Sequence, residues 1–208
     1  YPQANTSAAA AESTALAQFQ RLLSAEEFER LLAEMLRPLA PAIRLNPLKV
    51  GPAALADLAA RYGWETRPVP YCAYGWWIVT SQTPVSHTLE HRLGQYYIQD
   101  AASMLPVELF DFETEAAPLI LDLAASPGGK TTHLVDKTGD RGLVIANDSS
   151  RGRIMALRLV LQAWSVINVA VTRFPGEHFG AWFPETFDLV LLDAPCSMQN
   201  LRSTETHP

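Results

Sequence analysis

The chain has 208 residues, 48% of them hydrophobic, and a formal net charge of −6 with a pI near 5.3. That size and apolar content predict a buried core and about one domain plus part of another. The acidic balance excludes a uniformly basic nucleic-acid coat, although it leaves room for a local basic patch. The first residues lack the basic and apolar regions of a signal peptide, and no later run is apolar enough to span a membrane, so we expect no membrane contact.

Two cysteines and scattered histidines argue against a disulfide framework or a metal centre. Cys72 and Cys196 lie far apart, which favours a reducing, cytoplasmic compartment. We interpret Cys72 as a buried small hydrophobe. No metal ion is expected, because the histidines show no metal-ligand spacing. They are His87, His91, His133, His178 and His207.

The N-terminal half predicts a small-residue tail over 1–13 followed by an α+β domain over 14–115. Helical periodicity starts near Thr14, and Ser24 with Glu27 forms a capping box that opens a second helix. The next expected elements are a strand and turn over 43–49, a helix over 52–62, strands over 64–70 and 75–80, and an extended piece with a helix over 96–110.

From residue 116 buried apolar runs alternate with helical segments. The runs are "LILDLA", "GLVIAND", "INVAVT" and "FDLVLLDAP", with helices expected from Lys130 and from Arg151. Strands that are apolar on both faces and alternate with helices are typical of a parallel, doubly wound sheet. The second domain, 116–208, is therefore predicted to be α/β.

The glycine turn in "LDLAASPGGKTTHL", residues 121–134, indicates which ligand this sheet would hold. Residues 124–131 fit a loose phosphate-loop pattern, and Asp193 could imitate the aspartate that holds magnesium, so a P-loop-like nucleotide hydrolase is one hypothesis. Against it, Asp122 ends the first strand, where it would face a polyphosphate of like charge.

Three carboxylates, Asp122, Asp148 and Asp193, follow successive strands, and ligands of parallel sheets lie beyond those strand ends. Asp148 follows the second strand, where a carboxylate accepts hydrogen bonds from a ribose diol. A ligand with a ribose, an adenine and a positive charge would satisfy all three carboxylates. We therefore expect S-adenosylmethionine as the cofactor.

The segments "LDLAASPGGKTTHL", "ANDSSRGR", "LLDAPCS", "IRLNPLK" and "GQYYIQDAAS" resemble those of the RNA cytosine-C5 methyltransferases, in particular the bacterial RsmF (YebU) type. The resemblance implies a Rossmann-like methyltransferase domain over 116–208, with its C-terminal strands missing from this chain, behind an RNA-recognition domain over 14–115. It also implies methyl transfer from S-adenosylmethionine to C5 of a cytosine, with ribosomal RNA or the small ribosomal subunit as the partner.

Methyl transfer to cytosine C5 explains why the thiol of Cys196 lies close in sequence to the carboxylate of Asp193. Cytosine C5 is a poor nucleophile, so a Cys thiolate adds to C6 and makes C5 an enamine carbon that attacks the sulfonium methyl. By chemistry alone Cys196, which follows Asp193 and Pro195, would be the nucleophile. In the resembled family the nucleophile is a second Cys, expected here beyond Pro208, and the Cys at this position assists product release. The catalytic candidates are Cys196 and Asp193.

The resemblance also implies the binding residues. Arg44 and Asn46 match a family motif near the RNA-facing side, and Asp148 would hold the ribose. The sequence departs from the family at Pro175, near the adenine, and at residues 198–200 after the cysteine motif. The implied donor site comprises Ala124, Ala125, Ser126, Pro127, Gly128, Gly129, Lys130, Asp148, Arg153 and Asp193. A non-catalytic RNA-binding module of methyltransferase-like fold is the third hypothesis.

Overall fold

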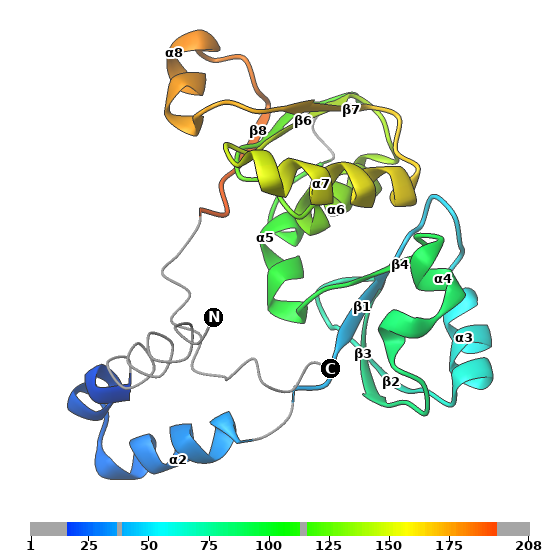
Figure 1. The fold of residues 1–208 in the computed structure, drawn as a ribbon, viewed down its shortest axis with the longest axis vertical. Helices are drawn as coiled ribbons and strands as arrows, with labels where there is room; N and C mark the ends of the chain where they lie inside the picture. The colour runs from blue at the N-terminus through cyan, green and yellow to red at the C-terminus, as the bar shows by residue number, and fades with distance from the viewer. Residues whose placement is uncertain (1–15, 37–38, 113–115, 195–208) are drawn as a thin grey trace, which may run out of the picture. The chain divides into compact units, whose positions relative to one another are not determined.

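A computed structural model describes residues 16–36, 39–112 and 116–194, so Cys196 and residues 198–200 lie outside the described residues. The described residues up to Leu39 belong to one unit, and Ala40–Ala194 form a second, compact unit (Figure 1). The first unit contains a helical segment over 16–22 and α2, Ala25–Met35. Ser24 and Glu27 form the predicted reciprocal capping box at the start of α2.

The small sheet of the second unit is antiparallel, with strand order β2-β3-β1-β4. Its strands are β1 (Ala42–Leu45), β2 (Glu65–Pro68), β3 (Gly75–Thr80) and β4 (Tyr96–Ile98), accompanied by α3 (Ala54–Tyr62), η1 (Val85–His87) and α4 (Leu89–Arg92). Gly63 ends α3 in the left-handed conformation, at φ 63°. Around this sheet Ile43, Leu58 and Trp64 pack into a buried core, as the predicted α+β domain requires.

The helix expected after the extended piece, from Ala101 to about Phe110, is shorter than predicted. The structure has a 3-10 turn, η2 (Ala101–Met104), followed by one α-helical turn, α5 (Leu105–Glu108). Asp100 caps η2 by accepting a hydrogen bond from the backbone N–H of Ala102. Pro106 has no backbone N–H, so a continuous α-helical hydrogen-bond ladder cannot run through this segment.

The larger sheet is parallel, with strand order β7-β6-β5-β8. This parallel sheet confirms the predicted Rossmann-like α/β fold. Since all four strands run the same way, the residues after each strand share one edge, where ligands of such sheets bind. The elements are β5 (Leu119–Asp122), α6 (Gly129–Thr138), β6 (Leu143–Asn147), α7 (Arg151–Trp164), β7 (Val169–Thr172), η3 (Gly176–His178), α8 (Phe179–Trp182) and β8 (Leu189–Leu191).

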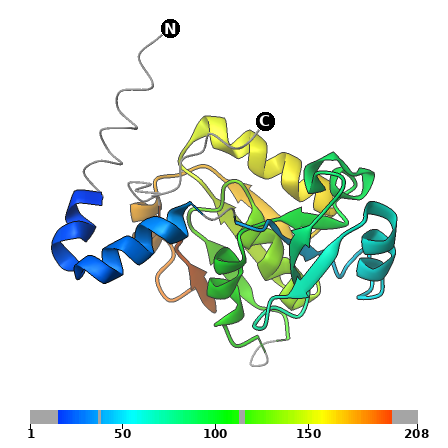
Figure 2. The same cartoon turned by 90° about the horizontal axis from the view of Figure 1, so that it is seen from below.

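Helices α6 and α7 lie along the face of the larger sheet that is turned toward the small sheet (Figures 1 and 2). Leu134 of α6 packs on Ile120 of β5, and Leu157 of α7 packs with Ala146 of β6. An apolar cavity of about 390 Å³ lies among strands β5 to β7 and residues 174–187. The two sheets belong to one compact unit, and the division at residue 115 remains a proposal.

Among the described residues, no helix combines the length and the apolar character needed to cross a bilayer.

Candidate active site

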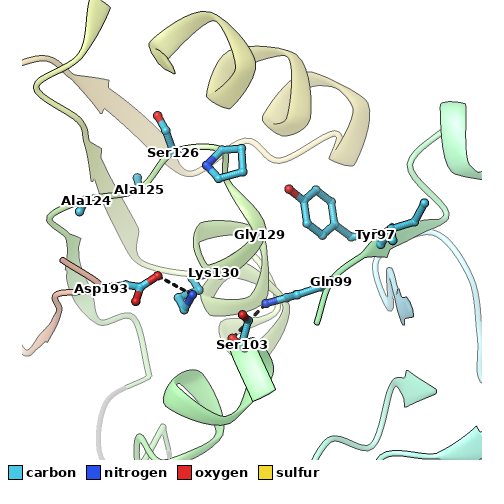
Figure 3. Close-up of a pocket in the computed structure, with 11 residues that line it drawn as sticks. Tyr97, Gln99, Ser103, Ala124, Ala125, Ser126, Gly129, Lys130 and Asp193 are labelled. Carbon is cyan, nitrogen blue, oxygen red and sulfur yellow. Dashed lines mark hydrogen bonds and ion pairs between the residues drawn. The ribbon is translucent and has the colours of Figure 1, made fainter. Parts of the chain in front are cut away.

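A pocket of about 210 Å³ opens at the carboxyl ends of β5 and β8 (Figure 3). The small sheet forms part of its wall, because the ring of Tyr97 from β4 lies across the pocket from Asp193, which follows β8. Most of the predicted donor residues therefore meet at one place. The lining residues are Tyr97, Ile98, Gln99, Ser103, Ala124, Ala125, Ser126, Pro127, Gly129, Lys130 and Asp193.

The two glycines of the turn are required by close packing. Gly128 has φ 118°, and a Cβ there would come within 3.0 Å of Val160 on α7. A Cβ on Gly129 would lie 2.8 Å from Tyr97 Cε1. The turn is thus pressed between α7 and the small sheet, and this contact fixes the first turn of α6 beside the pocket.

Opposite charges meet inside the pocket. Lys130 Nζ lies 2.6 Å from Asp193 Oδ2, with the lysine side chain 15% exposed and the aspartate 57% exposed. Because the Asp193 carboxylate is open to solvent, it can accept a further hydrogen bond from a ligand. The pocket therefore offers an anion, a cation and the N-terminus of α6 within one small volume.

Ser126 has an unused polar atom in this wall. Its hydroxyl oxygen is buried and has no hydrogen-bond partner among the described residues. A buried hydroxyl without a partner is costly. The neighbouring backbone is held firmly, since Ala125 N–H donates to the Asn147 carbonyl at 2.7 Å.

Asp148 lies behind the pocket wall and is not among the lining residues. Its side chain is 0% exposed. It accepts hydrogen bonds from the backbone N–H groups of Ser126, at 3.3 Å, and Ser150, at 2.8 Å, and from Arg153 Nη2 at 3.1 Å. Gly128 and Arg153 are likewise outside the lining set. In this structure Asp148 therefore shapes the loop that carries Ser126.

The hydroxyl that a phosphate loop would offer to magnesium is not available here. Thr131 is 0% exposed, and its hydroxyl donates to Asp122 Oδ2 at 2.7 Å. A nucleotide hydrolase needs this hydroxyl free for the metal ion, so this geometry disfavours that hypothesis.

Burial raises the pKa of the Asp122 carboxyl to about 6, although the hydrogen bond from Thr131 works in the opposite direction. A folded-state pKa above the unfolded value means that the folded protein binds the proton more tightly, so stability falls as pH rises from about 4 to 6. We expect wild type to lose stability relative to Asp122→Asn over this window, by at most about 3 kcal/mol. Urea denaturation of both proteins between pH 4 and 7.5 measures the difference. Parallel stability curves would contradict the assignment.

The positions of Arg44 and Asn46 do not support the predicted RNA contact. Arg44 on β1 is 1% exposed, and its guanidinium bonds to Asp136, Thr132 and the Gly129 carbonyl of α6. Asn46 is fully buried and donates to the Gly94 carbonyl at 2.9 Å and to the Trp164 carbonyl at the end of α7 at 3.1 Å. These side chains instead join the small sheet to the helices of the larger one.

Sequence reasoning did not identify the part of the pocket wall supplied by the small sheet. The segment "GQYYIQDAAS" contributes Tyr97, Gln99 and Ser103 to the wall. It carries the family resemblance, but its residue pattern contains no signal for ligand binding. Gln99 Nε2 donates to the Ser103 carbonyl at 3.1 Å, which holds this wall together.

Comparison with known proteins identifies the family. The sequence model of 16S rRNA methyltransferase RsmB/F matches residues 109–206, and that of the N-terminal domain of 16S rRNA methyltransferase RsmF matches residues 13–101. Ribosomal RNA small subunit methyltransferase F of Pectobacterium atrosepticum is 42% identical over 178 residues, covering 84% of this chain and 36% of that protein. The Enterobacter sp. protein of the same name is 41% identical over 186 residues, covering 88% and 39%. The chain thus spans little more than a third of these relatives.

Solved structures show the same fold. A methyltransferase homolog protein from Pyrococcus horikoshii superposes with a TM-score of 0.76 at 31% identity, covering 88% of this chain and 60% of that one. NSun6 from Pyrococcus horikoshii, solved with SFG, gives a TM-score of 0.73 at 18% identity, covering 87% and 70%, and supports the fold alone. With both family models matching in sequence order along the chain, this protein belongs to the RsmB/F family of 16S rRNA methyltransferases.

Proposed function

We propose that the protein transfers a methyl group from S-adenosylmethionine to C5 of a cytosine in small-subunit ribosomal RNA. The observation that carries this proposal is the pocket in which the loop of residues 124–130 faces Asp193 at the ends of β5 and β8. Family membership supports the reaction type, and the names of the relatives in Pectobacterium and Enterobacter support the substrate. Work on a ribosomal substrate would place the protein in the cytoplasm.

The residues present fit the donor. S-adenosylmethionine would supply an electrophilic methyl group on a sulfonium. Its methionine end carries a carboxylate, which would pair with Lys130, and an ammonium, which would pair with Asp193. The N-terminus of α6 favours the carboxylate.

Different residues of the chain position the donor, bind its charged end and act on the base. The loop between β5 and α6 sets the position of the donor, and Tyr97 closes the pocket from the side of the small sheet. Asp193 binds the donor's ammonium and faces the target base. Asp148, with Arg153 as its ion-pair partner, holds the loop, and by resemblance its carboxylate would accept a hydrogen bond from the donor's ribose. Cys196 lies outside the described residues and, by resemblance, releases the product after a second Cys has formed the adduct at C6.

Calorimetric titration of the full-length protein tests the donor assignment. We expect saturable binding of S-adenosylmethionine and no binding of ATP with magnesium. The opposite result would overturn the proposal in favour of the hydrolase. Donor binding without methyl transfer to 30S subunits or 16S rRNA would instead indicate the RNA-binding module.

Asp148→Asn should weaken S-adenosylmethionine binding about tenfold to a hundredfold and leave RNA affinity unchanged. The single amide oxygen can keep only one of the two backbone hydrogen bonds, from Ser126 or from Ser150, and the charge-assisted bond to a ribose hydroxyl, worth about 1.5 to 3 kcal/mol, is lost. Asp140→Asn is the matched control, because that carboxylate also accepts two backbone N–H bonds, from Ile167 and Asn168. Equal losses of donor and RNA affinity would contradict the assignment.

A further inference from the structure

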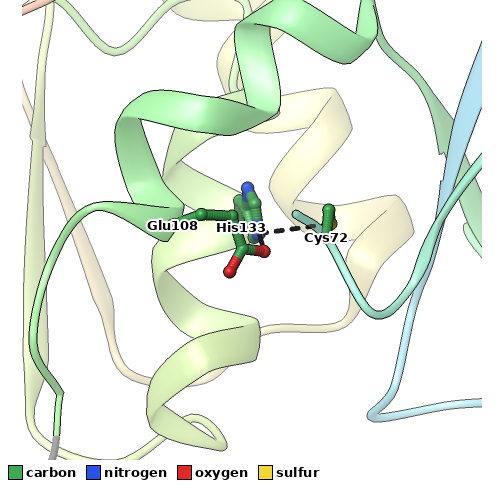
Figure 4. Close-up of side chains that lie close together, drawn as sticks. All are labelled: Cys72, Glu108 and His133. Carbon is green, nitrogen blue, oxygen red and sulfur yellow. Dashed lines mark hydrogen bonds and ion pairs between the residues drawn. The ribbon is translucent and has the colours of Figure 1, made fainter. Parts of the chain in front are cut away.

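Three potential metal ligands meet in the interior, away from the donor pocket (Figure 4). Cys72 lies in the turn between β2 and β3, Glu108 ends α5, and His133 lies in the middle of α6. Cys72 Sγ is 3.9 Å from His133 Nε2, which is 2.9 Å from Glu108 Oε1. The three ligand atoms all lie within 4.8 Å of one another.

These distances approach those of a tetrahedral zinc site. Zinc bonds of about 2.3 Å to sulfur, 2.05 Å to nitrogen and 2.1 Å to oxygen place sulfur about 3.6 Å from nitrogen, and nitrogen about 3.4 Å from oxygen. An ion would have to close the first distance by about 0.3 Å and open the second by about 0.5 Å. A thiolate, an imidazole and a carboxylate form a ligand set typical of zinc.

The surroundings leave room for an ion and orient one of the ligands, whereas the outer nitrogen of His133 has no support in the described part of the chain. A cavity of about 170 Å³ is lined by all three residues, which provides space for a water as the fourth ligand. Lys137 Nζ bonds to Glu108 Oε2 at 2.7 Å, so this oxygen is already oriented while Oε1 remains toward the cluster. His133 is 2% exposed and its Nδ1 has no partner among the described residues.

The protonation states define what binding must displace. Burial lowers the pKa of His133 to about 4, so its imidazole is neutral at pH 7. Burial raises the pKa of the Cys72 thiol to about 11, so an ion has to displace its proton to solvent. Burial alone would raise the pKa of Glu108, but hydrogen bonds from His133 and Lys137 lower it to about 2, which leaves a carboxylate.

Two features limit the affinity. Arg44 and Lys137 place positive charge nearby, although Asp136 pairs with Arg44 and Glu108 pairs with Lys137. With Nε2 on the metal, the proton moves to Nδ1 of His133, which lacks an acceptor. Sites without such outer support bind metal about 10- to 100-fold more weakly than supported ones.

We propose that Cys72, Glu108 and His133 bind one zinc ion, which links the β2–β3 turn of the small sheet to α5 and α6. This site is independent of the proposed methyl transfer, because none of the three residues lines the donor pocket. Its role is to stabilise the contact between the two sheets, since an ion that binds only the folded state raises stability.

Cobalt(II), which absorbs strongly when bound by thiolate, tests the site in the full-length protein carrying Cys196→Ser. We expect about one equivalent of cobalt to give a thiolate–cobalt absorption band, and zinc to abolish it. Cys72→Ser should remove the band. Glu108→Gln and His133→Gln should each weaken binding at least about tenfold, whereas His178→Gln, which changes an exposed histidine, should not.

Circular dichroism checks that each variant is folded, and the two glutamine variants decide the outcome if Cys72→Ser does not fold. Zinc should raise the Tm of the parent protein more than that of His133→Gln. Absence of the cobalt band in the parent, its survival in Cys72→Ser, or an equal zinc-dependent rise in Tm for His133→Gln would each overturn the proposal.

Discussion

Asp193→Asn should lower the rate of methyl transfer to 16S rRNA by about a hundredfold or more while the protein remains folded. The carboxylate is 57% exposed at the mouth of the pocket and pairs with Lys130. An amide has the same shape but no charge, so it leaves Lys130 uncompensated and cannot attract an ammonium. Because a solvent-open side chain at the end of β8 carries little of the core, its loss should affect the reaction rather than stability.

Steady-state kinetics with S-adenosylmethionine and 16S rRNA separate the possible roles of Asp193. A loss in kcat indicates that the carboxylate acts on the reacting base, whereas a rise in KM for the donor alone restricts it to binding the ammonium. Glu177→Gln in η3, an exposed carboxylate away from the pocket, is the matched control. An unchanged kcat/KM in Asp193→Asn would remove this residue from the site.

The elements with strong local signals were predictable from the sequence. The capping box at Ser24, the glycine that ends α3 and the apolar runs of the parallel strands each depend on neighbours a few residues away. The glycine turn was also identified, because a strand, a turn and a helix follow one another without interruption there. Local chemistry therefore predicted the fold class and the loop of the candidate site.

Features formed between the two sheets were not predictable in the same way. An arginine in a short strand, such as Arg44, is expected at the surface. In the structure Arg44 is buried and forms an ion pair with Asp136, 92 residues later. The cluster of Cys72 and His133 joins residues 61 apart, so no ligand spacing appears in the sequence. Asp148 was proposed from its position after β6, but its hydrogen bond from the Ser126 N–H joins residues 22 apart and has no local signal.

Arg44→Met should destabilise the folded unit by about 3 to 5 kcal/mol, because it leaves the Asp136 carboxylate buried without its partner. Burial lowers the pKa of Arg44 to about 9, so the guanidinium is charged at neutral pH. It donates to the Gly129 carbonyl at 2.9 Å and to Thr132 Oγ1 at 2.7 Å, and its Cζ lies 5.0 Å from the Trp164 ring. The measurement is the free energy of unfolding in urea.

Two comparisons make this prediction specific. Arg30→Met removes an ion pair with Glu26 whose side chains are 75% and 77% exposed, so it should cost no more than about 1 kcal/mol. Adding Asp136→Asn to Arg44→Met should recover part of the loss, since the amide oxygen still accepts the Trp164 Nε1 bond but buries no charge. Fully additive losses would mean that the pair does not couple the sheets. Because Arg44 bonds the first residue of α6, a real coupling should also weaken donor binding in Arg44→Met, so the small sheet would set the position of the glycine turn as well as the stability of the fold.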